Sequence, residues 1–144
     1  MNALAPFSLL RQPASVSSSV QRPPPGHIPR LALQKRLLAQ NYRLRLLISP
    51  AGFGKTVLLA DCARECPAGL RLLWLNCASS GLNPEQIAQQ LSKLLDYPPE
   101  LTANEVLMAL SQEPRRLWIM LNDYPSRLNS DLDDYLNQLL TESA

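Results

Sequence analysis

The sequence predicts an α/β protein with a parallel β-sheet. Two observations lead to this class. Short apolar runs of strand length alternate with longer segments whose apolar residues recur at helical spacing, and one such run leads through a glycine-containing turn straight into a helix-like segment. Strands separated by helices run parallel, because the helix carries the chain back to the starting edge of the sheet. A chain of 144 residues has room for one such domain.

Three apolar runs have the length and composition of buried strands. They are 44–48 (LRLLI), 71–76 (RLLWLN) and 117–121 (LWIML). Runs that are apolar throughout are typical of parallel strands, because helices cover both faces of a parallel sheet. We therefore expect about three strands.

Five segments predict helices, and their boundaries carry recognisable signals. Asn83 precedes Pro84, which suits a helix cap followed by the first helical residue. Thr102 and Glu105 have the spacing of a capping box. The five predicted helices lie in 29–40, 56–65, 83–97, 102–112 and 130–140.

The first 28 residues differ in composition from the rest. They include a serine cluster and a proline triplet, a combination that favours extended backbone, so we expect 1–28 to be a flexible leader and 29–144 to be the folded part. No apolar run approaches the roughly 18 residues that a membrane helix needs, and the start of the chain lacks the basic region of a secretory signal. We expect a cytoplasmic protein with no membrane partner, although the acid-free, Ser- and Arg-containing start leaves an organelle transit peptide open.

Charge is unevenly distributed along the chain. The net charge is +2, yet eight of the 14 Lys and Arg residues and none of the 12 acidic residues lie in residues 1–60. Such a basic half could face an anion, for example a nucleotide. The three cysteines lack metal-ligand spacing, and the one histidine, His27, lies in the proline-rich leader, so we expect neither a zinc site nor a histidine-based catalytic pair.

The glycine-containing turn between the first strand and its helix has most of a Walker A motif. In that motif, backbone N–H groups surround phosphate oxygens at a helix N-terminus, a lysine reaches the outer phosphates, and a hydroxyl binds Mg²⁺. Gly54-Lys55-Thr56 fill the closing positions, while Ser49 stands where the motif usually opens with glycine. The predicted nucleotide-binding residues are Ser49, Pro50, Ala51, Gly52, Phe53, Gly54, Lys55 and Thr56.

A second motif follows the third predicted strand. LWIML is followed directly by Asn122 and Asp123, as in a Walker B strand, whose carboxylate binds Mg²⁺ through water and helps to position the attacking water. We therefore assign Asp123 as the catalytic residue, and Thr56, Asn122 and Asp123 as the metal-binding residues.

These segments resemble one family of nucleotide-binding proteins. SPAGFGKTVLLADC resembles the phosphate loop of the LuxR-type large ATP-binding transcriptional regulators, which belong to the STAND class of signal-transducing ATPases. LNDYPSRLNSDLDDYLNQLL resembles the Walker B segment of that family, which usually reads Asp-Asp-Tyr-His. Here Asn122 replaces the first aspartate and Pro125 replaces the histidine. Because an amide brings no negative charge to the metal, this departure from the family pattern implies slow ATP hydrolysis. The likeness spans about residues 28–140.

The resemblance implies a P-loop NTPase fold, with a parallel sheet between two layers of helices, and a switch that binds ATP or ADP with Mg²⁺. It implies that 29–144 is the N-terminal portion of the nucleotide-binding domain. In this class a later strand lies between the phosphate-loop strand and the Walker B strand, so we expect an incomplete sheet and marginal stability or aggregation. Full-length relatives of this kind bind DNA through a C-terminal helix-turn-helix and self-oligomerise.

Two other functions remain open from the sequence. One is a small P-loop enzyme, such as a kinase or an ATPase, although after the second motif the only basic residue is Arg127, so no arginine-rich lid is present. The other is an interaction module that keeps the fold but binds no nucleotide. Asn122 favours this module, whereas Lys55 and Thr56 favour nucleotide binding.

Overall fold

A computed structural model describes residues 20–39, 43–127 and 129–142. Two strands, β1 (Leu70–Asn76) and β2 (Arg116–Asn122), pair in parallel and in register from Leu70 with Arg116 to Asn76 with Asn122. Both strands were predicted, to within a residue or two at their ends. The described residues form an α/β structure with a two-stranded parallel sheet and five helices.

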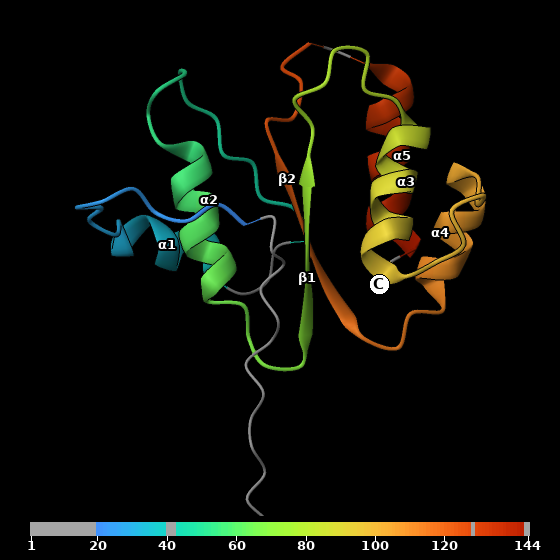
Figure 1. Cartoon of the computed structure of the whole chain (residues 1–144), viewed down its shortest axis with the longest axis horizontal. Helices are drawn as coiled ribbons and strands as arrows, with labels where there is room; N and C mark the ends of the chain where they lie inside the picture. The colour runs from blue at the N-terminus through green and yellow to red at the C-terminus, as the bar shows by residue number, and fades with distance from the viewer. Residues whose placement is uncertain (1–19, 40–42, 128, 143–144) are drawn as a thin grey trace, which may run out of the picture.

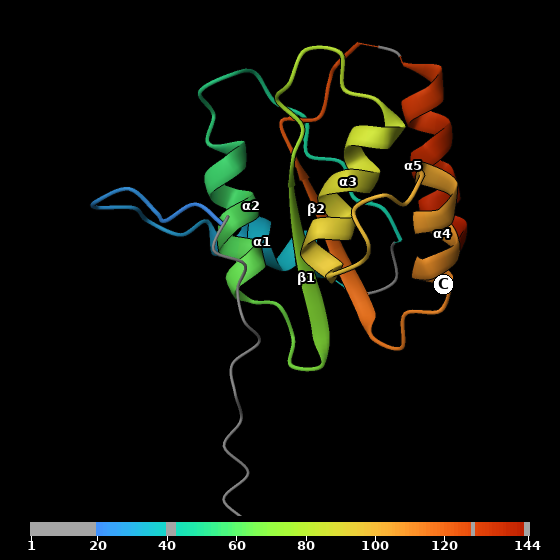
Figure 2. The ribbon, with the colours of Figure 1, turned by 45° about the vertical axis from the view of Figure 1, so that its right-hand side comes forward.

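The five helices match the five predicted segments. They are α1 (Leu31–Leu38), α2 (Lys55–Arg64), α3 (Pro84–Leu95), α4 (Ala103–Ser111) and α5 (Ser130–Glu142). Helices α1 and α2 lie on one side of the sheet, and α3, α4 and α5 lie on the other (Figures 1 and 2). The three layers agree with the expected α/β/α arrangement.

Strand β1 contributes to a core on each side of the sheet. Leu73 and Leu75 are buried in a large cluster with α3, α4 and α5, whereas Leu72 and Trp74 are buried in a smaller cluster with Ala60 of α2 and other residues. The alternation follows from the two-residue period of a strand, which points successive side chains to opposite faces. Burial on both faces explains why the strand is apolar throughout.

The predicted helix caps are present. The side chain of Asn83 accepts a hydrogen bond of 3.0 Å from the backbone N–H of Gln86, whose side chain accepts one from the N–H of Asn83. Thr102 and Glu105 form the same reciprocal pair at the start of α4. These bonds satisfy N–H groups that have no partner within their own helix.

The strand predicted at 44–48 is not formed in the described structure. Residues 44–48 carry no strand pairing in the described structure, and Leu44, Leu46 and Ile48 are 51%, 72% and 87% exposed. The prediction of a strand at 44–48 is therefore wrong for the described residues, which hold two strands rather than three. A strand exists only through bonds to a neighbour, and within the described part of the chain β1 and β2 pair only with each other. The segment begins near α5, where Arg43 donates to the carbonyl of Leu140.

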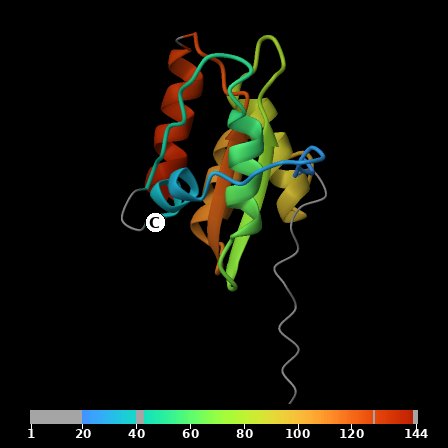
Figure 3. The same ribbon diagram turned by 90° about the vertical axis from the view of Figure 1, so that its left-hand side faces the viewer.

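Part of the predicted leader contacts α2. Residues 1–19 lie outside the described residues, while the chain from 20 to 30 contains a turn at residues 25–26 and crosses α2 (Figure 3). The division of the chain at residue 28 stays a prediction. None of the described helices is both long and apolar enough to cross a membrane.

Candidate nucleotide-binding site

The turn at residues 49–54 has the backbone geometry of a tight loop leading into a helix. Gly52 and Gly54 adopt positive φ angles of 82° and 76°, a left-handed conformation that glycine adopts without steric cost. Gly54 is the N-cap of α2; it supplies no side-chain cap, and the first turn of α2 holds no acidic residue. The helix therefore presents its N-terminal N–H groups and the positive end of its dipole in an arrangement that suits an anion.

Lys55 is the first residue of α2, and its side chain folds back over the loop. Its Nζ donates to the carbonyl of Ser49 at 2.7 Å and to that of Pro50 at 2.9 Å. An ammonium group has three donors and no acceptor, so these bonds hold the charge above the turn and leave it one further donor. The predicted lysine thus lies over the predicted loop.

The predicted metal-binding residues are brought together by the fold. Thr56 lies in the first turn of α2, and its hydroxyl donates to Oδ1 of Asn122 at 2.9 Å across 66 residues of sequence. Asn122 ends β2 and donates through Nδ2 to Oδ2 of Asp123 at 3.1 Å. Asp123 has a φ of 57°, in the left-handed region that is uncommon for residues other than glycine. Such backbone strain is frequent at functional sites.

The chemistry of these three side chains fits Mg²⁺. Mg²⁺ is bound by oxygen ligands, usually through one or two carboxylates, while it keeps several waters or phosphate oxygens. Thr56, Asn122 and Asp123 offer one hydroxyl, one amide and one carboxylate. Among the described residues no group of three or more His, Cys, Asp or Glu side chains is placed to hold a metal, so this set could hold Mg²⁺ only together with waters and the phosphates of a nucleotide.

Cys77 and Tyr124 contact or flank the end of β2 and are themselves hydrogen-bonded. The N–H of Cys77, just after β1, donates to the carbonyl of Asn122 at 2.8 Å. Burial, with a further contribution from the charge of Asp123, raises the pKa of the Cys77 thiol to about 11, so the thiol stays protonated at neutral pH. The hydroxyl of Tyr124 donates to Asp133 at 2.8 Å, and burial and this carboxylate raise the pKa of Tyr124. Asn122 and Asp123 are therefore flanked by neutral, well-anchored neighbours.

Two cavities lie outside the phosphate-loop residues. One, of about 460 Å³, lies between the 23–31 segment and α2. The other, of about 420 Å³, lies between the loops that follow β1 and β2. Neither of these two cavities is lined by residues 49–56.

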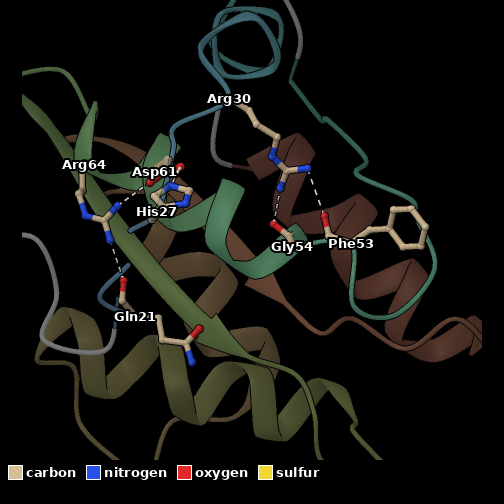
Figure 4. A network of polar contacts seen from close by, with 7 residues as sticks. All are labelled: Gln21, His27, Arg30, Phe53, Gly54, Asp61 and Arg64. Atoms are coloured by element: carbon tan, nitrogen blue, oxygen red, sulfur yellow. Dashed lines mark hydrogen bonds and ion pairs between the residues drawn. The ribbon is translucent and has the colours of Figure 1, made fainter. Parts of the chain in front are cut away.

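Three residues to which the sequence analysis gave no role, His27, Arg30 and Asp61, form polar contacts around α2. His27 lies 2.7 Å from the buried carboxylate of Asp61 on α2. Arg30 donates to the carbonyls of Phe53 and Gly54 (Figure 4). The prolines around His27 predicted a flexible leader, and no local signal in the sequence predicted these contacts. The bonded residues are 34 positions apart in the sequence for His27 and Asp61, and 23 for Arg30 and Phe53.

Fold and site together define a small α/β protein in which a Gly-Lys-Thr turn meets the end of a parallel strand. No family model matches the chain, and no solved structure matches it. Two curated relatives do match, and both are named HTH-type transcriptional regulator MalT. The one from Cronobacter sakazakii is 31% identical over 125 residues, and the one from Serratia proteamaculans is 32% identical over 125 residues.

Each match covers 77% of this chain and 13% of the relative. The chain belongs to the family of MalT-like transcriptional regulators, as the resemblance of its two motifs predicted, and it spans about an eighth of the length of these relatives.

Proposed function

We propose that the chain binds ATP and ADP with Mg²⁺ through residues 49–56 and acts as a nucleotide-dependent switch segment of a MalT-like regulator. The hydrogen bond between Thr56 and Asn122 carries this proposal, because it joins the two motifs that a P-loop site requires. The glycine turn, the helix N-terminus and Lys55 support it further. The expected cytoplasmic location belongs to the same proposal.

Each predicted residue has a distinct part in this proposal. The N–H groups of the loop and of α2 surround the phosphates, and Lys55 neutralises the charge of the outer ones. Thr56, Asn122 and Asp123 hold Mg²⁺, which would supply charge neutralisation on the phosphates. Asp123 orients the attacking water, while the neutral Asn122 keeps hydrolysis slow.

DNA binding and self-assembly belong to the proposal for a longer protein. The relatives are named as HTH-type regulators, and the described part of this chain is accounted for by the α/β unit. We place DNA recognition in a helix-turn-helix outside these 144 residues, with nucleotide state controlling oligomerisation.

A titration with fluorescent ATP and ADP, with and without Mg²⁺, tests nucleotide binding. Lys55→Ala should weaken ATP binding at least roughly tenfold, equal to about 1.4 kcal/mol, because a charge-assisted contact to phosphate is lost. Lys93→Ala, which removes an exposed lysine from α3, is the matched control and should leave the affinity unchanged. Unchanged ATP affinity in a folded Lys55→Ala variant contradicts the proposed phosphate site.

Asn122, at the end of β2, favours one alternative function, an interaction module that binds no nucleotide. An interaction module that binds no nucleotide would tolerate Asn122 at the metal position, and the same titration would then show no saturable binding of ATP or ADP. A small P-loop kinase or ATPase would instead turn over ATP at a rate that Asp123→Ala abolishes.

A further inference from the structure

The segment that precedes α1 forms several contacts with α2, the helix that follows the phosphate loop. We name residues 20–30 the arm. Val20 packs against the small core beside α2, the carbonyl of Gln21 accepts from Arg64 at 2.8 Å, His27 meets Asp61 at 2.7 Å, and Arg30 reaches the loop. The arm crosses α2 (Figure 3), and its contacts extend from Arg64, at the C-terminal end of α2, to Gly54 at its N-terminal end (Figure 4).

The middle of the arm is held by a buried charge. Asp61 is 5% exposed, and its two carboxylate oxygens are occupied by Nε2 of His27 and Nη1 of Arg64, each at 2.7 Å. A carboxylate only accepts hydrogen bonds, so His27 carries a proton on Nε2 and donates it. Without His27 the Oδ2 atom of this buried carboxylate would lose its bond, which is costly, and this cost favours the docked position of His27. Prolines at 23–25 and 29 restrict the backbone on both sides of His27.

The end of the arm is bonded to the loop itself. Arg30 donates from Nη1 to the carbonyl of Phe53 at 3.1 Å and from Nη2 to that of Gly54 at 2.8 Å. The Gly54 carbonyl also accepts the first helical hydrogen bond of α2, from Leu58 at 3.0 Å. A Cβ atom added to Gly54 would lie 2.8 Å from Nη2 of Arg30. The planar guanidinium thus lies against the glycine and orients two consecutive carbonyls of the loop.

This contact also changes the charge at the loop. Arg30 and Lys55 both lie at the N-terminal end of α2, where no acidic residue occupies the first turn. A helix N-terminus carries partial positive charge, so cations there are unfavourable until an anion neutralises them. An anion bound at the loop therefore stabilises the docked arm, and the docked arm in turn favours the anion.

We propose that the arm regulates the nucleotide site: docking of His27 on Asp61 places Arg30 on the loop, and Arg30 is a positioning residue that raises nucleotide affinity. This inference rests on the proposed function, since it concerns the same loop. Coupling between two sites is reciprocal. Nucleotide must therefore stabilise the docked arm by the same factor by which docking strengthens nucleotide binding.

The test measures ADP affinity in the full 144-residue chain and in arm variants. His27→Ala, at a residue whose contact is with Asp61 rather than with the loop, should weaken ADP binding about fivefold or more, at the lower end of typical coupling factors. Arg30→Ala should weaken it at least as much, and Arg30→Lys, which keeps the charge but loses the planar guanidinium that bonds both carbonyls, should restore part of the loss. Arg36→Ala, an exposed arginine on α1, is the control and should have no effect.

Two further measurements distinguish coupling between arm docking and nucleotide binding from a purely structural effect of the arm on stability. The double variant His27→Ala/Arg30→Ala should bind ADP no more weakly than Arg30→Ala, because His27 acts through Arg30; fully additive losses overturn the proposal. In hydrogen exchange, ADP should slow exchange of the peptide covering 26–38 in the parent chain and not in Arg30→Ala. Equal slowing in both chains also overturns it.

The outcomes distinguish this inference from the proposed function. If Lys55→Ala weakens ADP binding while folded His27→Ala and Arg30→Ala variants bind like the parent, the nucleotide site stands and the arm's role is refuted. If the parent chain binds no nucleotide, both proposals fall. Arg30 and its contacts are exposed, so Arg30→Ala and Arg30→Lys keep the test usable should His27→Ala fail to fold.

Discussion

The hydroxyl of Thr56 donates a 2.9 Å hydrogen bond to Oδ1 of Asn122. Thr56 belongs to the first turn of α2 and Asn122 is the last residue of β2, so this bond joins the Gly-Lys-Thr turn to the end of the neighbouring strand. Both side chains are half-buried, which limits competition from water. The two motifs recognised separately in the sequence therefore share one location.

Thr56→Val should weaken this junction, because valine has the shape of threonine without its hydroxyl. Asn122 Oδ1 loses its donor, and we expect a loss of about 1 kcal/mol in the free energy of unfolding without ligand, measured by urea denaturation. We also expect ATP binding to lose most of its Mg²⁺ dependence. Thr141→Val removes a hydroxyl bonded within α5 and should change only stability. If Thr56→Val binds ATP with unaltered Mg²⁺ dependence, Thr56 is not a metal ligand.

Asn122→Asp should strengthen the Mg²⁺ dependence of ATP binding, because it restores a negative ligand at the end of β2. It also removes the donor that serves Asp123 and places two carboxylates side by side. We therefore expect lower stability without Mg²⁺ and recovery when Mg²⁺ and nucleotide are added, followed by thermal melting. Asn104→Asp, at an exposed site on α4, is the charge-matched control. Unaltered metal dependence would show that Asn122 does not face the metal.

Cys77 should make stability sensitive to alkaline pH. Its pKa rises from an ordinary 9.0 to about 11 in the fold, through burial and then Asp123. The folded state thus favours the protonated thiol, and its contribution to stability is complete below pH 9 and lost as pH rises toward 11. Urea denaturation from pH 8 to 11 should show a decline that is shallower in Cys77→Ala.

A labelling experiment provides an independent check on Cys77. At pH 8 the half-buried Cys66 should react with a thiol reagent before the buried Cys77 does, because the thiolate is the reactive form. Fast modification of Cys77 in the folded chain would contradict its burial.

The extended segment at 44–48 should promote self-association. Leu46 and Ile48 are 72% and 87% exposed on a segment without strand pairing in the described structure, and exposed apolar strand-forming sequences tend to pair with other chains. The double substitution Leu46→Lys/Ile48→Lys should lower the apparent mass in light scattering at high protein concentration. Met108→Lys changes a 66% exposed residue on α4 and should have a smaller effect. Equal effects would assign association to general hydrophobicity.

The capping box of α3 should contribute measurably to stability. Asn83→Ala removes the acceptor for the N–H of Gln86, and we expect a loss of about 1 kcal/mol in the free energy of unfolding. Asn137→Ala, at an exposed interior site of α5, is the control and should be nearly neutral or slightly stabilising. A loss below a few tenths of a kcal/mol in Asn83→Ala would mean that water replaces the cap without cost.

Much of the candidate site could be recognised in the sequence, because its parts are local. Gly54, Lys55 and Thr56 are consecutive, and their geometry follows from a glycine turn that opens a helix. Asn122 and Asp123 were recognised from the apolar strand before them. The roles of these residues toward nucleotide and Mg²⁺ stay predictions, whereas their proximity is a property of the structure.

The sequence by itself determined the five helices, the caps of α3 and α4, and the two paired strands, because apolar periodicity and capping act over a few residues. The tertiary structure decided the rest. Residues 44–48 have the composition of a strand but no neighbouring strand to bond among the described residues, so the strand predicted from composition is not formed. His27, which looked like part of a loose leader, lies on Asp61, and Arg30 lies on Gly54, because a buried carboxylate and two loop carbonyls take donors from a distant segment. Such pairings depend on how the chain packs, which local sequence patterns do not encode.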